Sequence, residues 1–264
     1  MSASGAEFED VAVEAAHAGG EVLRRRFADR KRLTVEVKAK HDYVTEVDRE
    51  AEAAVIAILR RRVPDHAILA EEGSTGGAHA AYRWIVDPLD GTTNFIHGVP
   101  AFAVSIGLTD GSGLIAGAVY DPCRDETFHA HRGGGAFLNG SPIACTKLDQ
   151  LDAALIATGF PFREMVNLPS YLAAFERFVR STSGLRRAGS ASLDLVYTAS
   201  GRYDGFFEVG LKSWDLAGGA LVVMEAGGVV TDVRGGASFL EDGSVVAAGS
   251  RLHAKMLEIT RETL

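Results

Sequence analysis

The 264-residue sequence has only two cysteines, and they do not form a Cys-x-x-Cys arrangement. This scarcity argues against a disulfide framework and favours a reducing compartment such as the cytoplasm. Long apolar runs are absent as well, since no stretch reaches the roughly 18 residues that a membrane helix needs. The first residues carry no basic region followed by an apolar one. We therefore expect a soluble, unprocessed, cytoplasmic protein without a membrane partner.

Excess positive charge is also missing. The formal net charge is -8 at pH 7, so a broad basic surface for direct binding of nucleic acid is not predicted. The sequence contains neither a G-x-G-x-x-G fingerprint nor a P-loop lysine, and Gly133–Gly135 and Asn139–Gly140 are therefore interpreted as hairpin turns. If the protein binds phosphate, it must do so through a few local groups.

Apolar residues, in contrast, make up 47% of the sequence, enough for one large core or two closely packed lobes. Apolar residues at helical spacing predict a helix from Phe8 to about Phe27. Thr45 is suited to cap a second helix that ends near Arg62. Between these helices, Leu33–Lys38 alternates like a strand, and Lys38–Tyr43 is a polar loop that could form a mobile flap.

The rest of the chain predicts a change of architecture near its middle. Three runs separated by turns predict an antiparallel meander: Phe102–Leu108, Leu114–Tyr120 and Thr127–Ala130. Further on, helices are expected at Pro169–Arg180, Ser192–Ser200, Leu216–Glu225 and Leu252–Thr263, and strands at Leu155–Thr158, Gly205–Val209, Gly228–Asp232 and Val245–Ala248. We divide the chain into an α+β lobe, residues 1–145, and an α/β lobe, residues 146–264, which together form one compact unit.

The most informative stretch is an apolar run that ends in two carboxylates, a sharp turn and two hydroxyls. Trp84–Val86 predicts a short buried strand that Pro88 ends. Asp87 and Asp90 would then lie a few ångströms apart, and carboxylates that close favour either a shared proton or a bound cation. One residue of Thr92–Asn94 is expected to cap a following helix, whose first N–H groups suit an anion. A cation site and a phosphate site would therefore touch.

Further carboxylates lie at the ends of predicted elements or inside them. Glu71 follows a short apolar strand one loop before Asp87, so the two strand ends are expected to converge. Asp215 follows Trp214 and is expected to cap a helix rich in alanine, glycine and leucine. Asp48 lies in the first turn of the second helix, where it could simply complement the helix dipole. Glu208 lies in an otherwise buried strand and needs a partner there.

A set of hard oxygen ligands is therefore expected to meet: Glu71, Asp87, Asp90 and Asp215. No Cys/His set of the kind that zinc prefers accompanies them, so Mg²⁺ is the natural ion. A second ion about 4 Å away would clamp the attacking and leaving oxygens of a displacement, which predicts hydrolysis of a phosphate ester. Because no serine, cysteine or histidine is visibly placed as a covalent nucleophile, water should attack directly.

Several segments resemble the signatures of the inositol monophosphatase family. These are Glu71–Gly73, Asp87–Phe95 and Trp214–Gly219, and the likeness spans nearly the whole chain. Two more, Arg187–Leu195 and Gly205–Glu208, particularly resemble the bacterial inositol-1-monophosphatase branch. The resemblance implies a layered αβαβα sandwich, normally a homodimer, with Mg²⁺-dependent and lithium-sensitive phosphomonoesterase activity.

The resemblance also implies metal ligands. Glu71, Asp87 and the Leu89 carbonyl match the first metal site of the family, and Asp87, Asp90 and Asp215 match the second. Glu71 also matches a ligand that reaches a third ion through water. The family pattern therefore implies two or three Mg²⁺ ions in each active site.

Other residues match groups that handle the water and the substrate. Thr92, assisted by Asp48, matches the pair that helps to deprotonate the attacking water, in which Glu71 also takes part. Gly91 and Thr92 match the amides that bind the phosphate. The positions that hold the substrate hydroxyls are matched by Asp90, Gly189, Ser190, Ala191 and Glu208.

The alcohol half of the substrate is less well defined. Animal members of the family tend to carry histidine and cysteine where this chain has Lys212 and Ser213, close to Glu208. The leading hypothesis is myo-inositol 1-phosphate or a similar polyol phosphate, and the alternatives are histidinol phosphate, fructose 1,6-bisphosphate and 3′-phosphoadenosine 5′-phosphate. The sequence shows no basic or aromatic pocket near Glu208 for a nucleotide. Bacterial relatives also associate with the transcription machinery, so a regulatory partner there is the non-enzymatic alternative.

Overall fold

The computed structural model describes residues 4–29, 35–39, 42–75, 80–162 and 165–264. Its first layer is a pair of amphipathic helices, α1 (Gly5–Ala28) and α2 (Glu46–Arg62), close to their predicted bounds. Each begins with a reciprocal cap. Ser4 accepts from the Glu7 N–H and the Glu7 carboxylate accepts from the Ser4 N–H, while Thr45 and Asp48 form the same arrangement in α2. The predicted cap at Thr45 is confirmed.

An eight-stranded sheet lies beneath these helices, in the order β10-β9-β8-β7-β6-β5-β3-β4. Its strands are β3 (Ala67–Ala70), β4 (Ser74–Thr75), β5 (Arg83–Asp90), β6 (Ala103–Thr109), β7 (Leu114–Asp121), β8 (Glu126–His131), β9 (Gly135–Leu138) and β10 (Ser141–Pro142). Among the described strands of this sheet, only β3 and β5 pair in parallel, and β5 to β10 form the antiparallel meander expected from the sequence.

A second sheet has five strands in the order β12-β11-β13-β15-β14. Its members are β11 (Leu155–Thr158), β12 (Gly184–Arg186), β13 (Gly205–Val209), β14 (Gly228–Thr231) and β15 (Ser244–Gly249). Strand β11 is parallel to both of its neighbours, and β15 is antiparallel to both of its own. The mixed α/β character predicted for this half of the chain is confirmed.

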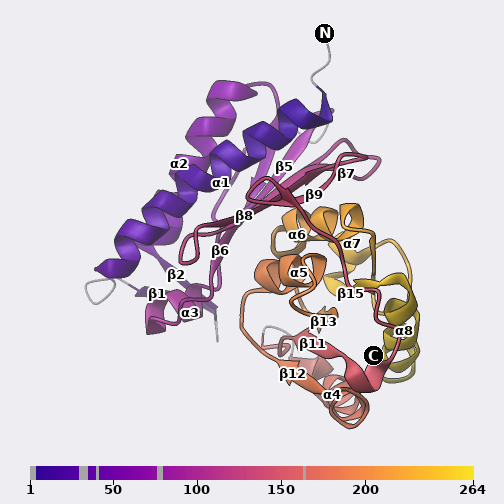
Figure 1. Ribbon diagram of the computed structural model, residues 1–264. Coiled ribbons are helices and arrows are strands. Elements are labelled where there is room, and N and C mark those ends of the chain that lie inside the picture. The colour runs from indigo at the N-terminus through magenta and orange to yellow at the C-terminus, as the bar shows by residue number, and fades with distance from the viewer. Residues whose placement is uncertain (1–3, 30–34, 40–41, 76–79, 163–164) are drawn as a thin grey trace.

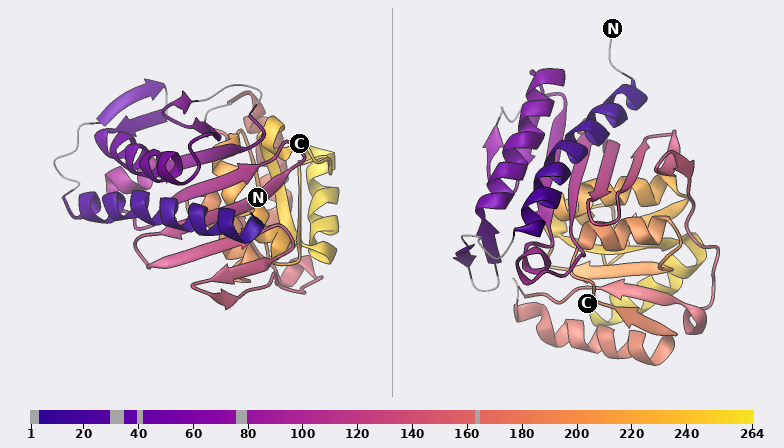
Figure 2. Two further views of the ribbon diagram at one scale, coloured as in Figure 1. Left: turned by 90° about the horizontal axis from the view of Figure 1, so that it is seen from above. Right: turned by 60° about the vertical axis from the view of Figure 1, so that its left-hand side comes forward.

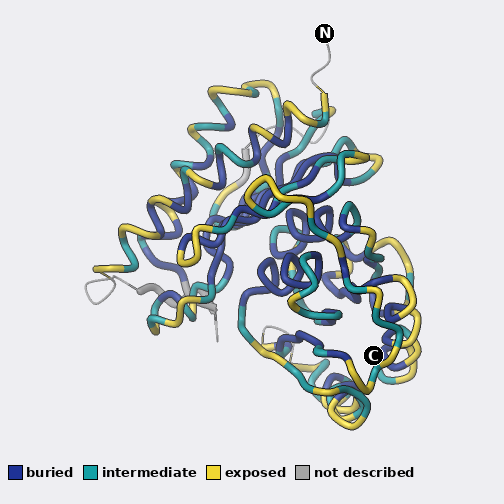
Figure 3. Tube along the Cα trace, viewed as in Figure 1, coloured by how far each residue is buried: buried dark blue, intermediate teal, exposed yellow. Residues whose placement is uncertain are grey.

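Helices fill the remaining layers (Figures 1 and 2). Between the sheets lie α5 (Ala191–Ala199) and α6 (Ser213–Glu225), and the outer face of the second sheet is covered by α4 (Leu168–Ser181) and α8 (Ser250–Thr263). Shorter helices are α3 (Thr92–His97) and α7 (Phe239–Asp242), with single 3-10 turns at Leu151–Ala153 and Met165–Asn167. The expected αβαβα sandwich is therefore confirmed. Figure 3 shows α5 and α6 almost wholly buried, whereas α1, α2 and α8 expose one side. Within the described residues, every helix is too short or too polar to cross a bilayer.

Helix α6 lies so close to the first sheet that glycine is required at the contact. A Cβ on Gly117 of β7 would lie 2.8 Å from the carbonyl oxygen of Gly218. A Cβ on Gly107 of β6 would lie 2.6 Å from the Cβ of Ala217. Both distances are shorter than normal carbon contacts, so side chains cannot separate these backbones. The first turn of α6, which carries Asp215, is thereby fixed against the sheet.

The polar segment Lys38–Tyr43 differs from its prediction as a loop. Lys38 belongs to β1 (Val35–Ala39), and Tyr43 belongs to β2 (Asp42–Thr45), which pairs antiparallel with β1. Strand pairing satisfies the backbone of these polar residues, an arrangement that their composition alone did not predict. Residues 40–41, and with them the suggested flap, lie outside the described residues.

Candidate active site

The centre of the site lies at the end of strand β5, which does not stop at Pro88 as predicted. It continues to Asp90, with an irregular register opposite β6 between Asp87 and Asp90. Such a bulge tolerates a proline because one residue there is left out of the ladder. In a regular strand, Asp87 and Asp90 would point to opposite faces, whereas the irregular register lets both reach the same site. The Leu89 N–H donates to the Asp87 carboxylate at 2.9 Å and fixes the turn.

Helix α3 begins differently from the sequence prediction. Gly91 is its N-cap, with a left-handed φ of 96° and no side-chain cap bond, so Thr92–Asn94 lie inside the helix instead of capping it. Only glycine fits this position easily, because a Cβ would also lie 2.9 Å from the Ala101 carbonyl oxygen. The backbone N–H groups of the first helical turn face outward without intrahelical acceptors. Free N–H groups of this kind can donate to an anion, and here they lie beside the carboxylates.

The Thr92 hydroxyl points back toward the carboxylate of Asp48. Its Oγ1 lies 3.1 Å from Asp48 Oδ1 and 3.1 Å from the Leu89 carbonyl oxygen. Asp48 is buried, and its other oxygen accepts from the N–H and the hydroxyl of Thr45 at 2.8 and 2.6 Å. Burial raises the pKa of Asp48, against the effect of these hydrogen bonds. Asp48 therefore caps α2 and contacts Thr92 with the same carboxylate.

Asp215 enters the site from the start of α6. It was predicted to be the N-cap, but the helix begins at Ser213, and Lys212 is the N-cap. Asp215 lies in the first turn, where its carboxylate accepts from the Lys212 N–H at 2.7 Å. The apolar pattern of the sequence begins only at Leu216, so it predicts a helix start later than the observed one at Ser213. Both positions leave a carboxylate at the positive end of the helix, where it is favoured.

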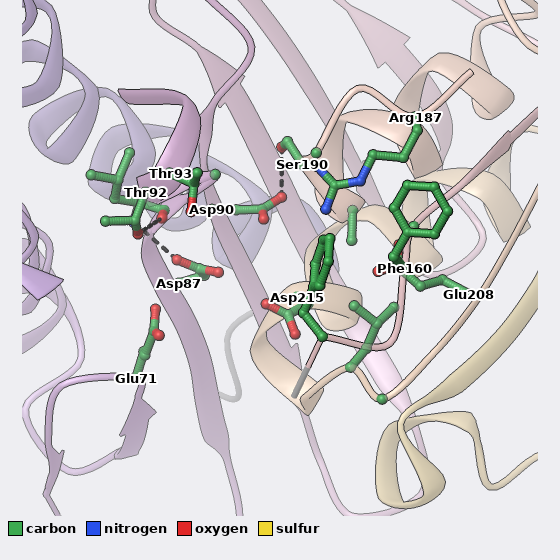
Figure 4. A pocket seen from close by; sticks show the side chains of 18 of the residues that line it. Glu71, Asp87, Asp90, Thr92, Thr93, Phe160, Arg187, Ser190, Glu208 and Asp215 are labelled. Carbon is green, nitrogen blue, oxygen red and sulfur yellow. Dashed lines mark hydrogen bonds between the residues drawn. The ribbon is translucent and has the colours of Figure 1, made fainter. Parts of the chain in front are cut away.

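These elements bring carboxylates together. Asp87, Asp90 and Asp215 each offer an oxygen within 4.8 Å of the others, and all three side chains are buried. Parallel pairing of β3 with β5 matches Ala70 to Val86, so Glu71 follows at the same edge as Asp87. Figure 4 shows the Glu71 carboxylate turned toward Asp87, with Asp90 and Asp215 across the pocket.

The electrostatics of this cluster favour a bound cation. The pKa of Asp87 is raised well above its ordinary value, first by burial and then by the negative charges of Glu71, Asp90 and Asp215. Burial also raises the pKa of Asp90, although three donors from Ser190 and Ser192 converge on its Oδ2 at 2.5 to 2.7 Å. A divalent ion would neutralise this repulsion, and the all-oxygen donor set fits Mg²⁺.

The carboxylates form one end of a pocket of about 320 Å³. Nearly every residue singled out from the sequence lines it: Glu71, Asp87, Leu89, Asp90, Gly91, Thr92, Gly189, Ser190, Ala191, Glu208 and Asp215. Asp48 is the exception and lies behind Thr92. Gly159 makes room for Glu208, because a Cβ on Gly159 would lie 2.0 Å from Glu208 Oε1.

The structure adds residues that sequence reasoning missed. Phe160, Phe162 and Arg187 line the same pocket as Glu208 (Figure 4). The expectation of no basic or aromatic group near Glu208 is therefore wrong. Two features of the sequence could have indicated this aromatic and basic lining. They are the Phe-Pro-Phe sequence at 160–162 and the arginine that begins the segment leading to Gly189.

The fold and the site together define a class of protein: an αβαβα sandwich in which strand ends and a helix start gather buried carboxylates beside the glycine turn that begins α3. The inositol monophosphatase family matches residues 5–264, and the chain belongs to this family.

Relatives carry two kinds of name. The chain is 49% identical over 253 residues to the Nus factor SuhB of Pseudomonas aeruginosa, covering 94% of this chain and 93% of that protein. It is 42% identical over 256 residues to the inositol-1-monophosphatase of Mesorhizobium japonicum, covering 97% and 96%. Among solved structures, the extragenic suppressor protein suhB from Bartonella henselae superposes with a TM-score of 0.92 at 39% identity, covering 97% of this chain and 98% of that one.

Proposed function

We propose that the protein is a Mg²⁺-dependent phosphomonoesterase that hydrolyses myo-inositol 1-phosphate or a similar polyol phosphate by direct attack of water. The meeting of the buried Asp87, Asp90 and Asp215 carboxylates within 4.8 Å carries this proposal. Burial and the negative charges of Glu71, Asp90 and Asp215 all raise the pKa of Asp87, and a metal ion is a natural source of compensating positive charge.

The ion ligands follow from this arrangement and from the family pattern. One ion would take Glu71, Asp87 and the Leu89 carbonyl, a second would take Asp87, Asp90 and Asp215, and a third would be reached from Glu71 through water. When bound, Mg²⁺ makes water more acidic and offsets the charge of the phosphate. The first N–H groups of α3, at Gly91 and Thr92, would bind the phosphate oxygens.

The pair of Thr92 and Asp48 is proposed to help remove the proton of the attacking water. Thr92 Oγ1 lies 3.1 Å from Asp48 Oδ1, and Thr45 holds the other Asp48 oxygen in place. A carboxylate with a raised pKa is a stronger base than an ordinary one, which suits a residue that withdraws a proton through a hydroxyl.

The alcohol half of the substrate would contact the other side of the pocket. Its proposed partners are Asp90, Gly189, Ser190, Ala191 and Glu208, all of which line the cavity. A carboxylate such as Glu208 accepts from hydroxyl groups, which favours a polyol. Histidinol phosphate, fructose 1,6-bisphosphate and 3′-phosphoadenosine 5′-phosphate remain the alternatives.

A phosphate-release panel tests both parts of the proposal. Purified protein with Mg²⁺ is assayed with myo-inositol 1-phosphate and the three alternatives, and the inositol ester is expected to give the highest kcat/KM. Release that is fastest from another compound would overturn the polyol assignment but retain the metal chemistry. No release from any of the four would show that the enzymatic proposal is wrong.

The relatives named Nus factor SuhB support a second proposal, namely that the protein also binds a component of the transcription machinery. A pull-down from cell lysate would compare the wild-type protein with the Asp90→Asn variant. We expect the same transcription component with both, because loss of metal chemistry need not change the outer surface. If neither protein retains one, the binding role is ruled out.

Three family properties complete the proposal: a homodimer, a cytoplasmic location and inhibition by lithium. Sedimentation analysis should give twice the chain mass, and cell fractionation should place the protein with cytoplasmic markers. Titration with Li⁺ should reduce phosphate release. A monomer at all concentrations, recovery elsewhere or insensitivity to Li⁺ would contradict the respective property.

A further inference from the structure

The Asp90 carboxylate is held by two serines of the α/β lobe. The Ser190 hydroxyl, the Ser192 N–H and the Ser192 hydroxyl donate to the same oxygen, Oδ2, at 2.6, 2.7 and 2.5 Å. The other oxygen, Oδ1, receives none of these three bonds. In Figure 4 the bond from Ser190 reaches Asp90 from one side, whereas Asp87 and Asp215 lie on the other. The two oxygens of Asp90 therefore have different surroundings.

This contact is closed to solvent and lies at the start of a buried helix. Asp90 is 8% exposed, Ser190 1% and Ser192 0%, so water has little access to replace the serine donors. Ser192 lies in the first turn of α5, where its N–H has no intrahelical acceptor. Ser190 is the N-cap residue, but its side chain forms no cap bond to the helix. Asp90 therefore caps α5 from the other lobe, at the end that favours a negative charge.

The three donors restrict how Asp90 can bind a metal ion. A carboxylate oxygen offers about two lone pairs, so three donors leave no room for an ion on Oδ2. Oδ1 is then the single oxygen of Asp90 that can reach an ion shared with Asp87 and Asp215. Asp90 is thereby limited to coordination through one oxygen.

Coordination through one oxygen or two distinguishes Mg²⁺ from Ca²⁺. Mg²⁺ is small and demands near-octahedral geometry, which the narrow angle between two oxygens of one carboxylate does not fit. Ca²⁺ is larger, takes about six to eight oxygen ligands in flexible geometry and accepts a carboxylate through both oxygens. A carboxylate that offers only one oxygen therefore favours the smaller ion.

We propose that Ser192, together with Ser190, makes the ion site of Asp90 selective for Mg²⁺ over Ca²⁺. This inference rests on the proposed function, which assigns Asp90 to the second ion. The serine hydroxyls close Oδ2, and Asp90 gives only Oδ1 to the ion. Ser192 is not among the residues that line the pocket, so its hydroxyl acts through Asp90 and is a positioning group.

Metal binding by the purified protein tests this role. Mg²⁺ and Ca²⁺ are titrated separately by calorimetry into the wild type, Ser192→Ala and the double variant Ser190→Ala/Ser192→Ala. The Asp90→Asn variant identifies the binding event that involves Asp90, because that event should weaken most. Thr198→Val is the matched control. It removes another buried hydroxyl of α5, one that donates to the Asp194 carbonyl oxygen at 2.9 Å.

The preference for Mg²⁺ is measured as the ratio of the Ca²⁺ dissociation constant to the Mg²⁺ dissociation constant. Ser192→Ala should lower this ratio by about 3- to 10-fold, and the double variant by at least about 10-fold. Mg²⁺ should bind more weakly because Asp90 is held less firmly, whereas Ca²⁺ should lose less affinity or gain some because Oδ2 has fewer donors. Thr198→Val should keep the ratio of the wild type.

An unchanged ratio in the serine variants, including equal losses of affinity for both ions, would show that the serines only support the local fold and would overturn the proposal. The same change in Thr198→Val would overturn it as well, and so would an Asp90→Asn protein that keeps every binding event or a wild type that binds neither ion. Phosphate release is assayed in parallel. A wild type that releases no phosphate would contradict the phosphatase function, while calorimetry would still report the ion preference of each variant.

Discussion

The two ends of the pocket are built in opposite ways. At the carboxylate end, Asp87, Asp90 and Asp215 are buried, and each accepts a backbone N–H that fixes its position. At the arginine end, Phe162 is 43% exposed, Arg187 is exposed and both belong to connecting segments. Groups on secondary structure inside a core hold precise geometry, whereas groups on connections can change without disturbing that core. Under the proposed function, we expect the first end to determine the reaction chemistry and the second end to determine the choice of substrate.

Removal of divalent ions should abolish the catalytic function proposed for the carboxylate end of the pocket. Dialysis against a chelator is expected to lower phosphate release by at least about 1,000-fold, because neither water activation nor charge neutralisation would remain. Added Mg²⁺ should restore the rate and raise the melting temperature, since an ion that binds only the folded chain stabilises it. Full activity in the chelator would contradict the proposed metal site.

Among single substitutions, Asp90→Asn should have the largest effect. The neutral amide weakens one ion site while keeping the shape of the side chain, and a loss of about 100- to 10,000-fold in kcat is expected. Phosphate release and circular dichroism would be measured together, with the exposed Asp65→Asn as a matched control. An unchanged rate in the folded Asp90→Asn protein would show that the site assignment is wrong.

Thr92→Val should have an intermediate effect because it removes the hydroxyl that contacts Asp48. We expect kcat to fall about 100-fold with little change in KM, and Thr92→Ser to retain most of the rate. The neighbouring Thr93→Val is the control, since Thr93 lines the pocket without a hydrogen bond to Asp48 among the described residues. Equal losses at both positions would argue against a specific role for the Thr92 hydroxyl.

Glu208→Gln should have the smallest effect and should change binding more than chemistry. Loss of the charged acceptor is expected to raise KM for inositol 1-phosphate about 10-fold, with kcat within about 3-fold of the wild type. Steady-state kinetics at saturating Mg²⁺ would separate the two constants. A fall in kcat as large as that of Asp90→Asn would show that the two ends of the pocket do not differ in function as proposed.

The sequence predicts the carboxylate end better than the arginine end, for physical reasons. Asp87 and Asp215 follow or begin apolar patterns, so local periodicity already places them at the ends of elements. The exact position of each carboxylate within its strand or helix is harder to predict. Proline normally ends a strand, and the irregular pairing opposite β6 that accommodates Pro88 involves a different part of the chain.

The arginine end depends on contacts between distant segments. Phe160 follows β11, and Arg187 follows β12, and only the parallel pairing of these strands brings the two side chains together. Neither segment has a periodic pattern that predicts such a meeting. Tertiary contacts of this kind lie beyond propensity and spacing, which explains why the aromatic and basic lining appeared only in the structure.

The glycine contact between α6 and the first sheet has a consequence for the thermal behaviour of the site. Side chains that separate two elements can exchange rotamers, and the spacing between those elements then fluctuates as temperature rises. Gly117 and Gly218 have no rotamers, so this route is closed where α6 meets β7. The separation between Asp215 and the carboxylates of β5 should therefore stay nearly constant on warming. An ion-binding geometry fixed in this way would persist until the sandwich itself unfolds.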